Sequence, residues 1–414
     1  MQQFIDKISG NLCYFNNFSI SDISGNNAII MNSIIKTIKN NLNIRYHNLH
    51  YSSENCEVLQ DLKTAQDFLY PNGLQFKPER IVISDYKISH EVLPITGSSI
   101  MLTIFPEIGT ASFSINLNFK DATTEQVIFL KQCSGGPEKF KIESMDGETK
   151  YVAIKEVFSS LVKAINVPCD AFNKNCLIEL NKFGQSDEVK NIINSEAKRL
   201  YGILTGDEGW EFVGEELAKD RISQNWGSRE FVKFIAFGSN YMLINLNKEE
   251  IAQKYEIHQD EYTQKHYGGK NEYFSLKSSF AGINHGILFS VETVMAIKTV
   301  AKYILDKQTS FRNQKIQNFN LAIKRTQSYR KDLMLTLNKL QEIDFSELGE
   351  LENLVLRSQH IDPIIEKIKY LLELLESELT LMYSERTNKL VNILTIFGLC
   401  FTVIQTAISI YSLF

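Results

Sequence analysis

The chain contains 414 residues, of which 43% are apolar and 22% are charged, and this composition excludes a disordered chain. Its net charge of -5, from 44 basic and 49 acidic residues, excludes a protein that coats nucleic acid with a basic surface. The six cysteines form no CxxC pair, so we expect free thiols and neither a disulfide framework nor a zinc site.

The first 275 residues combine helical and strand-like patterns, which predicts an α+β domain over 1–275. Apolar residues recur at helical spacing in 27–42 and 60–70. Between 80 and 146 the period changes to two, in runs that predict an antiparallel meander: IVISDYKI, SIMLTIF, ASFSINLNFK, EQVIFLK and KFKIES.

The second half of this domain is expected to contain two helices followed by two strands. Helical spacing returns at 151–165 and 188–201, and the segments FVKFIAF and YMLINL are again typical of strands. A break near residue 195 would divide the domain into two lobes.

Residues 276–387 predict a helical stalk. Helices are expected at 283–305 and 311–340, and a third begins near Pro363. Apolar residues of the third helix step by three and four, which is a heptad seam: Ile365, Ile368, Leu372, Leu375, Leu379 and Met382. The stretch 302–331 has eight basic residues and one acidic residue, whereas 341–385 has eleven acidic and three basic residues. This contrast favours two paired stalk helices, with a basic helix that faces an anionic ligand as the alternative.

The apolar C-terminal segment predicts one membrane-spanning helix over 388–414. Residues 390–414 carry no charged side chain, and a helix of that length is about 37 Å long, enough to cross a bilayer core of about 30 Å. The N-terminus has no apolar signal segment. Arg386 and Lys389 precede the span, so the positive-inside rule places the rest of the chain in the cytosol. We therefore expect a single-pass protein of the inner (cytoplasmic) membrane.

One face of the predicted membrane helix is polar. At 100° per residue, an arc of about 100° is shared by Asn388, Asn392, Thr395, Leu399, Thr402, Thr406 and Ser409. Lipid does not solvate amides and hydroxyls, so this face either lines a hydrated pore or packs against its copies in a closed bundle. In a pore, Leu399 would be a hydrophobic constriction, and Glu378 and Glu385 would form carboxylate rings that favour cations at the cytosolic mouth.

Three short segments of this helix carry a family resemblance. Arg386-Thr387-Asn388, Leu394-Thr395-Ile396 and Ile410-Tyr411 resemble the first membrane helix of the CorA family of magnesium channels, which also follows an acidic stalk helix and an α+β domain. The resemblance implies that Asn388, Asn392, Thr395, Thr402 and Ser409 line a pore. The sequence departs from the family in lacking the Gly-Met-Asn filter and the second membrane helix, because Tyr411 is followed by Ser412-Leu413-Phe414.

CorA-like proteins without the magnesium signature occur as membrane effectors of bacterial antiphage defence, in type III CRISPR and Hailong systems. Similarity to that class implies a homo-oligomer, a tetramer or pentamer, that conducts ions in response to a nucleotide or oligonucleotide and disrupts the membrane potential. It also implies a nucleotidyltransferase-type partner that makes the signal. The alternatives are a CorA-like divalent-cation (magnesium) transporter and a tail-anchored scaffold that conducts no ions.

Two groups of residues are candidates for binding the signal. An aromatic face beside a guanidinium can hold a base and its phosphate, and one Gly-rich segment contains Trp210, Trp226 and Arg229. A glycine turn among lysines can bind an anion, and Ser134-Gly135-Gly136 is flanked by Lys131, Lys139 and Lys141. The alternatives are core tryptophans and a plain hairpin turn. The sequence has no P-loop, GxSxG, HExxH or GxGxxG motif, so we expect no enzyme activity, cofactor or metal site.

Overall fold

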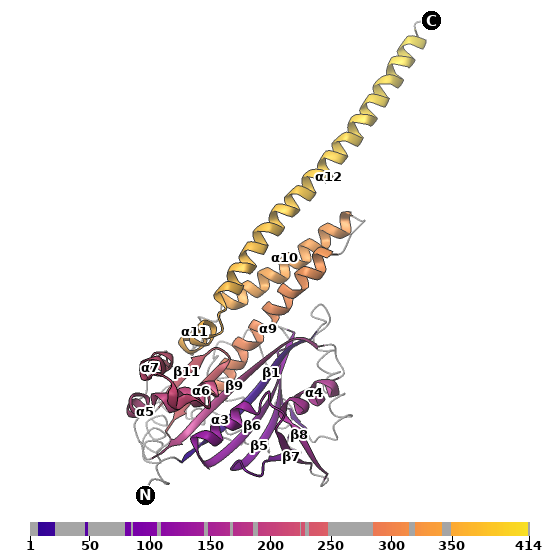
Figure 1. The fold of residues 1–414 in the computed structure, drawn as a ribbon. Coiled ribbons are helices and arrows are strands. Elements are labelled where there is room, and N and C mark those ends of the chain that lie inside the picture. Colours follow the sequence, from indigo (N-terminus) through magenta and orange to yellow (C-terminus); the bar gives the residue numbers. More distant parts are fainter. Residues whose placement is uncertain are drawn as a thin grey trace, which may run out of the picture. The chain divides into compact units, whose positions relative to one another are not determined.

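A computed structural model describes residues 7–20, 46–48, 79–83, 86–105, 109–144, 148–165, 169–184, 189–223, 225–227, 232–246, 285–313, 319–341 and 349–412. The chain forms two compact units (Figure 1). The sheet unit comprises Met1–Tyr303 and Gln341–Asp362, and the helical unit comprises Ile304–Leu340 and Pro363–Phe414. The helices predicted at 27–42 and 60–70 lie outside the described residues.

A nine-stranded sheet forms the centre of the sheet unit, in the strand order β10-β11-β12-β9-β1-β6-β5-β3-β2. Neighbouring strands are antiparallel except for β12 and β9, which are parallel. The strands are β1 Ile8–Ile20, β2 Tyr46–Asn48, β3 Glu79–Ile83, β5 Ile95–Phe105, β6 Thr110–Ala122, β9 Cys169–Phe183, β10 Asn225–Trp226, β11 Val232–Phe237 and β12 Asn240–Asn245. Because β9 pairs with β12, residues on both sides of position 195 belong to one sheet.

The two faces of this sheet differ in polarity although the described side chains at its centre are buried on both. In β6, Phe113, Ile115 and Leu117 point to one face, whereas Ser112 and Ser114 point to the other, because side chains alternate along a strand. We call these the apolar face and the polar face. The strands β5, β6, β1 and β9 contribute to both faces in the same alternating manner.

Short helices and a second sheet complete the core on the apolar face. The second sheet has the order β4-β7-β8. Its strands are β4 Tyr86–Ser89, β7 Lys139–Ser144 and β8 Thr149–Ala153, and the helices are α3 Thr124–Gln132, α4 Ile154–Ile165, α5 Val189–Ser195, α6 Ala197–Thr205, η2 Trp210–Phe212 and α7 Glu215–Ser223. The core cluster joins Leu12, Phe113 and Ile178 of the large sheet to Leu130 of α3 and Leu200 of α6, all of them buried.

The predicted meander is wrong in two respects. The segment EQVIFLK is not a strand, because Thr123 caps a helix there: its hydroxyl accepts from the Gln126 amide at 3.3 Å, and the Gln126 side chain accepts from the Thr123 amide at 2.9 Å. The segment IVISDYKI supplies β3 and β4, which belong to different sheets. Strands β1 and β9, the central pair of the large sheet, were not predicted.

The remaining predictions on the sheet unit hold with shifted boundaries. The helix predicted at 151–165 starts at Ile154 because 149–153 is β8, and the helix predicted at 188–201 is split at Glu196 into α5 and α6. The strands predicted in FVKFIAF and YMLINL are β11 and β12.

The helices described in the C-terminal part of the chain are α9 His285–Asn313, α10 Phe319–Gln341, α11 Gly349–Ser358 and α12 Asp362–Tyr411. Three of them were predicted, including the start of α12 at Pro363. The helix α9 begins in the sheet unit and continues into the helical unit, and α11 belongs to the sheet unit. Between α11 and α12 the chain turns at His360, whose φ of 51° is in the left-handed region.

Candidate functional site

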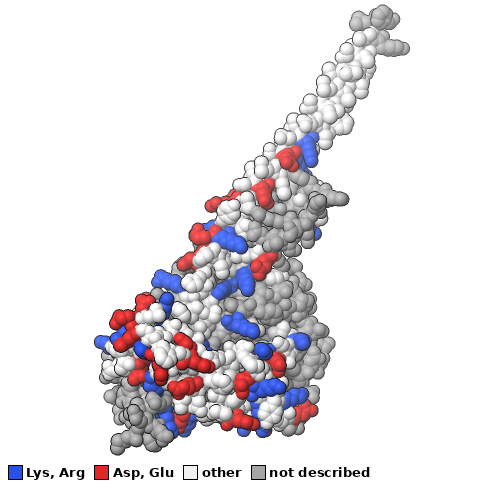
Figure 2. Space-filling model, in the orientation of Figure 1, with Lys and Arg blue, Asp and Glu red and all other residues white. Residues whose placement is uncertain are grey.

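The C-terminal half of α12 is the candidate membrane span. It is the described helix that is long and apolar enough to cross a membrane, and none of its most apolar window is buried. Every side chain described from Tyr383 to Ile410 is exposed, and the distal part of α12 shows no acidic or basic side chain in Figure 2. An exposed apolar helix of this length requires lipid or other helices to cover it.

The polar face of this segment is partly satisfied within the helix itself. The hydroxyls of Thr395, Thr402 and Thr406 each donate at 2.8 Å to the backbone carbonyl four residues earlier. The amides of Asn388 and Asn392 have no hydrogen-bond partner among the residues that the structure describes. The two asparagines, rather than the threonines, are therefore the groups that still require water or another helix.

The polar face continues towards the start of α12 as a row of exposed positions, with Leu374 half-buried, which we call the outer seam. Steps of four and three residues back from Asn388 lead to Ser384, Leu381, Ser377, Leu374 and Tyr370. Tyr370 is 63% exposed and Leu381 is 65% exposed. Large apolar side chains repeated at heptad spacing and open to solvent are typical of a surface that packs against another helix.

The predicted heptad seam lies on another side of α12 and is covered within the chain. Its residues are buried at Ile368, Leu375 and Leu379 and half-buried at Ile365, Leu372 and Met382. Helix α10 runs antiparallel to α12, because Gln327 Nε2 donates to Tyr383 Oη at 2.7 Å while Arg330 pairs with Glu376 at 3.5 Å. The ion pair joins the basic helix to the acidic helix, as the first interpretation of their charges predicts.

The two predicted mouth carboxylates flank the outer seam. Glu378 is half-buried and Glu385 is exposed, and neither has an ion-pair partner among the described residues. Their positions on α12 leave both carboxylates accessible to solvent in a single chain.

Two residues of the predicted aromatic site, Trp210 and Trp226, lie in the described part of the chain. Trp210 lies in η2 and packs on α6, where a Cβ at Gly202 would stand 2.5 Å from the Trp210 Cβ. Trp226 is half-buried in the edge strand β10, opposite Phe234 of β11. Arg229 lies outside the described residues. Trp210 thus packs against the hydrophobic core, close to the alternative interpretation of a core tryptophan.

The predicted lysine cluster is dispersed as well. The Lys131 ammonium is buried beneath α6 and donates to the Ile203 carbonyl at 3.2 Å, and burial lowers its pKa to about 8. Lys139 and Lys141 lie on β7, where Lys141 pairs with Glu143 at 2.5 Å. That pairing raises the pKa of the exposed Lys141 ammonium through its hydrogen bond with the Glu143 carboxylate.

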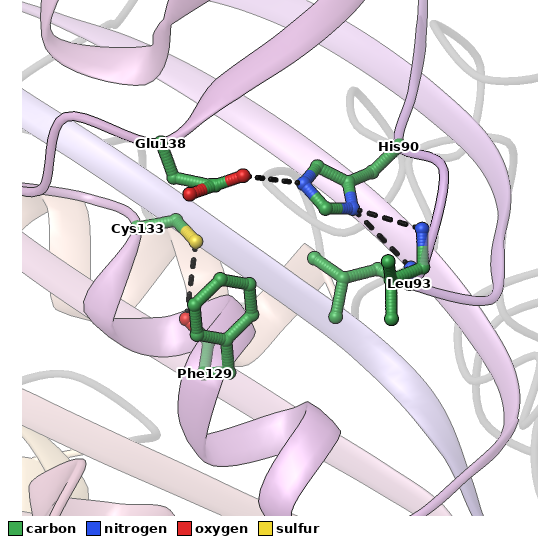
Figure 3. Close-up of polar contacts among 6 residues, drawn as sticks. His90, Leu93, Phe129, Cys133 and Glu138 are labelled. Atoms are coloured by element: carbon green, nitrogen blue, oxygen red, sulfur yellow. Dashed lines mark hydrogen bonds and ion pairs between the residues drawn. The ribbon is translucent and has the colours of Figure 1, made fainter.

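The turn at Ser134-Gly135-Gly136 follows helix α3 and does not join two strands. The amides of Ser134 and Gly135 donate to the carbonyls of Lys131 and Gln132 and so close the end of α3. Next to the turn, His90 Nε2 contacts Glu138 Oε1 at 3.1 Å, while its Nδ1 accepts from the backbone amides of Val92 and Leu93 (Figure 3). The two turn amides are therefore already engaged and do not offer an anion site.

The described cysteines form no disulfide. Cys13, Cys133 and Cys176 are buried, and Cys400 is exposed on α12. Burial raises the pKa of Cys133 to about 12 and that of Cys176 to about 11, so both remain protonated near neutral pH. No group of three or more metal-ligating side chains occurs in the described residues.

Sequence reasoning missed the polar face of the large sheet. Regular alternation in TASFSINLNFK is typical of a strand with one solvent-exposed face, yet its polar side chains are buried. The buried polar side chains of this face are Asn11, Asn17, Ser19, Ser99, Thr103, Thr110, Ser112, Ser114, Asn116, Asn175, Glu179 and Asn245. Alternation gives the face to which a side chain points but does not tell what covers that face.

Many polar atoms on this face have no hydrogen-bond partner among the described residues. These atoms are Asn11 Nδ2, Asn17 Nδ2, Thr110 Oγ1, Ser112 Oγ, Ser114 Oγ, Asn116 Oδ1 and Asn245 Oδ1. A buried polar group without a hydrogen bond destabilises the folded state by about 1–3 kcal/mol. A cluster of such groups in one layer is therefore strongly destabilising unless water or a ligand bonds to it.

Helix α9 lies against the polar face. The Thr103 hydroxyl donates to Glu292 Oε1 at 3.2 Å, and the Tyr241 hydroxyl contacts the Met295 sulfur at 3.6 Å. Both Glu292 and Ser290 of α9 are fully buried, and the Ser290 hydroxyl has no partner among the described residues. The polar layer therefore lies between the sheet and the helix that continues into the helical unit.

A hydrogen-bond cluster around Gln359 connects this layer to the end of α11. The Gln359 amide nitrogen donates to Tyr241 Oη at 2.5 Å and to the Gly238 carbonyl. Its amide oxygen accepts from Lys298 of α9. Gln359 precedes the first residue of α12 by three positions, so one side chain bonds to β12, to the β11–β12 turn and to α9 beside the start of α12.

Comparisons with protein-family models, with curated proteins and with solved structures found no match to this chain.

Proposed function

We propose that copies of this chain assemble into a membrane pore lined by the polar face of α12 and opened or closed by a nucleotide-type signal that binds the sheet unit in the cytosol. In this proposal the chain is an antiphage-defence effector that disrupts the membrane potential. The observation that carries the proposal is the fully exposed apolar segment of α12 with a polar face that includes two unpartnered amides. Amides in hydrocarbon are costly, and a water-filled lumen or a neighbouring copy relieves that cost.

The outer seam supports assembly of several copies. Its Tyr370 and Leu381 side chains are exposed to solvent, and its heptad spacing continues without a break into Asn388 and Thr395. Copies that pair along the outer seam would bring their polar faces together at one axis. Glu378 and Glu385 would then gather near the entrance and favour cations.

The test is ion flux through liposomes that contain the full-length chain, measured for the wild type and for two variants. We expect Asn392→Leu to abolish flux, because it places an apolar group in the lumen and removes an amide that holds water. Ile404→Leu is the matched control: it puts the same side chain on the opposite face, and we expect flux to be unchanged. Equal flux from Asn392→Leu and the wild type would contradict the pore.

The intrahelical bonds of Thr395, Thr402 and Thr406 favour a second candidate, a tail anchor that conducts no ions. Threonine hydroxyls bonded to their own helix are tolerated in lipid, so these residues alone do not require a lumen. In that case neither wild type nor variants conduct ions, with or without added nucleotides and short oligonucleotides. Flux in the wild type would exclude the anchor.

A further inference from the structure

We infer that the first turns of α10 and the adjoining part of α12 form one surface that binds the anionic phospholipid headgroups of the cytosolic leaflet. The inference rests on the proposed membrane span of α12. It goes further, because it names a second helix that contacts the membrane surface and the class of lipid that this helix binds. Both helices belong to the helical unit. The residues of this surface, which we call the basic surface, are Lys324, Arg325, Arg386 and Lys389.

The first step concerns the level of α10 relative to the membrane span. Gln327 of the antiparallel helix α10 bonds to Tyr383 of α12 at 2.7 Å. Lys324 is three residues before Gln327, which is about 4.5 Å along α10. Arg386 is three residues after Tyr383, which is the same distance in the same direction because the helices are antiparallel. Lys324 and Arg386 therefore lie at about the same level, one turn before the charge-free segment that begins at residue 390.

The second step concerns the charge at this level. The segments 320–328 and 384–391 together hold four basic residues and one acidic residue, Glu385. The four basic side chains are all exposed. Farther from the span the sign of α12 reverses, because 362–380 holds five acidic and two basic residues. A surface that is positive within one turn of a membrane span lies within reach of the phosphates of the leaflet and attracts anionic lipids.

The third step concerns the face of α10 that carries Lys324. The neighbouring Ile323 and Thr326 are buried, whereas Lys324 is exposed and has no ion-pair partner among the residues that the structure describes. Leu321, one turn nearer to the span and at the level of Lys389, is 44% exposed. An exposed leucine on the membrane side of an exposed lysine suits the membrane interface, where the apolar group enters the acyl boundary and the ammonium stays at the headgroups.

The test is titration of phosphatidylglycerol, or of phosphatidylcholine with the same acyl chains, into the full-length chain in a nonionic detergent. Bound lipid is counted by native mass spectrometry. We expect phosphatidylglycerol to bind more tightly than phosphatidylcholine. In Lys324→Glu its affinity should fall about fivefold or more, because a basic residue near anionic lipid is replaced by a repelling charge. Raising the salt from about 0.1 M to about 1 M shortens the Debye length from about 10 Å to about 3 Å and should remove the preference.

The matched control is Lys331→Glu. Lys331 is exposed on the same face of α10, seven residues after Lys324, and lies about 10 Å farther from the span. That distance exceeds the Debye length of about 8 Å at physiological salt, so this variant should bind phosphatidylglycerol within about twofold of the wild type. Lys324→Arg keeps the charge and should bind like the wild type.

Three results would each overturn the inference. The first is equal affinity of the wild type for the two lipids, and the second is an equal loss of affinity in Lys324→Glu and Lys331→Glu. The third is displacement of phosphatidylglycerol by soluble glycerol phosphate at millimolar concentration, because the basic surface would then bind a free anion rather than a lipid surface.

Lipid binding is measured without any reference to conductance, so the two proposals fail separately. A preference for phosphatidylglycerol that Lys324→Glu removes, in a protein that conducts no ions, would leave the basic surface standing and contradict the pore. Ion flux in a protein that shows no lipid preference would leave the pore standing and contradict the basic surface.

Discussion

At the scale of single residues, burial of polar and charged groups is the dominant feature of the sheet unit. Lys131 is the clearest case, since its ammonium is buried and bonded to one carbonyl. Burial disfavours the charged form and lowers its pKa from 10.5 to about 8, while the nearby Cys176 thiol opposes this shift. The protein therefore carries an energetic cost at neutral pH that an apolar residue would not impose.

We expect Lys131→Met to stabilise the protein at pH 7 and to lose this advantage as the pH approaches 10. Below pH 8 the lysine is protonated in both states, and the full cost, roughly 3 kcal/mol for a shift of this size, falls on the folded state. Between pH 8 and 10.5 the unfolded state binds more protons, so the free energy of unfolding of the wild type rises with pH. Chemical denaturation at several pH values measures the difference, and a difference that is independent of pH would contradict the shifted pKa. The exposed Lys155→Met on α4 is the control and should show no such trend.

At the scale of elements, α12 has two seams with different partners. Ile368, Leu375 and Leu379 are buried within the helical unit, and Gln327 and Arg330 of α10 bond to Tyr383 and Glu376 of α12. On the outer seam, the side chains of Tyr370 and Leu381 are exposed. One helix thus makes intrachain contacts on one side and exposes a heptad-spaced row on another side.

We expect Leu381→Glu to dissociate the oligomer, because like charges would meet at every copy of the outer seam. The measurement is the mass of the detergent-solubilised full chain by native mass spectrometry. Tyr383→Glu introduces the same charge off the outer seam, and its complex should keep the wild-type mass. Dissociation by both variants, or by neither, would contradict assembly along the outer seam.

How far the sequence predicts these elements depends on what each pattern encodes. The long helices and the membrane segment follow from periodicity and from the absence of charge, and the structure confirms a long apolar helix over 362–411. The sequence predicted the heptad seam at Ile365–Met382 but not its partner, because heptad spacing does not indicate whether the seam packs on its own chain or on another chain. The strand predicted in EQVIFLK was wrong because the cap at Thr123 outweighs a short apolar run that fits helix and strand equally.

The residues of the candidate site were harder to predict from the sequence than the helices and strands. The sequence predicted the polar face of α12, but it offered Trp210 and Lys131 for ligand binding. In the structure Lys131 is buried and bonds to Ile203 of α6, and Trp210 is half-buried against Gly202 of α6. The polar layer of the sheet was missed because alternate serines and asparagines in a strand normally indicate a solvated face. Only the tertiary structure shows that α9 lies over them.

At the scale of the whole molecule, Gln359 marks where the sheet unit leads into α12. Its side chain bonds to Tyr241, to the Gly238 carbonyl and to Lys298, all in the sheet unit, three residues before α12 begins. The pKa of Lys298 is lowered by partial burial, which makes the amide oxygen an important partner for its charge.

We expect Gln359→Leu to destabilise the sheet unit by about 2–4 kcal/mol, because it leaves the Tyr241 hydroxyl and the Lys298 ammonium without this partner. Thermal melting of the full chain is the measurement. Gln327→Leu, at an exposed amide that bonds to Tyr383, is the control and should cost less than 1 kcal/mol. Equal losses from the two variants would contradict a special role for Gln359.

Within the described residues, the outermost strands of the large sheet are short: β10 spans two residues and β2 spans three. Long open edges invite strands of other chains to add on, and short edge strands suppress that association. If copies assemble at a membrane as proposed, they are locally concentrated and their sheets would meet often. In the proposed assembly, short edges would limit strand addition between copies, and the complex would grow through its helices, which can form a closed ring.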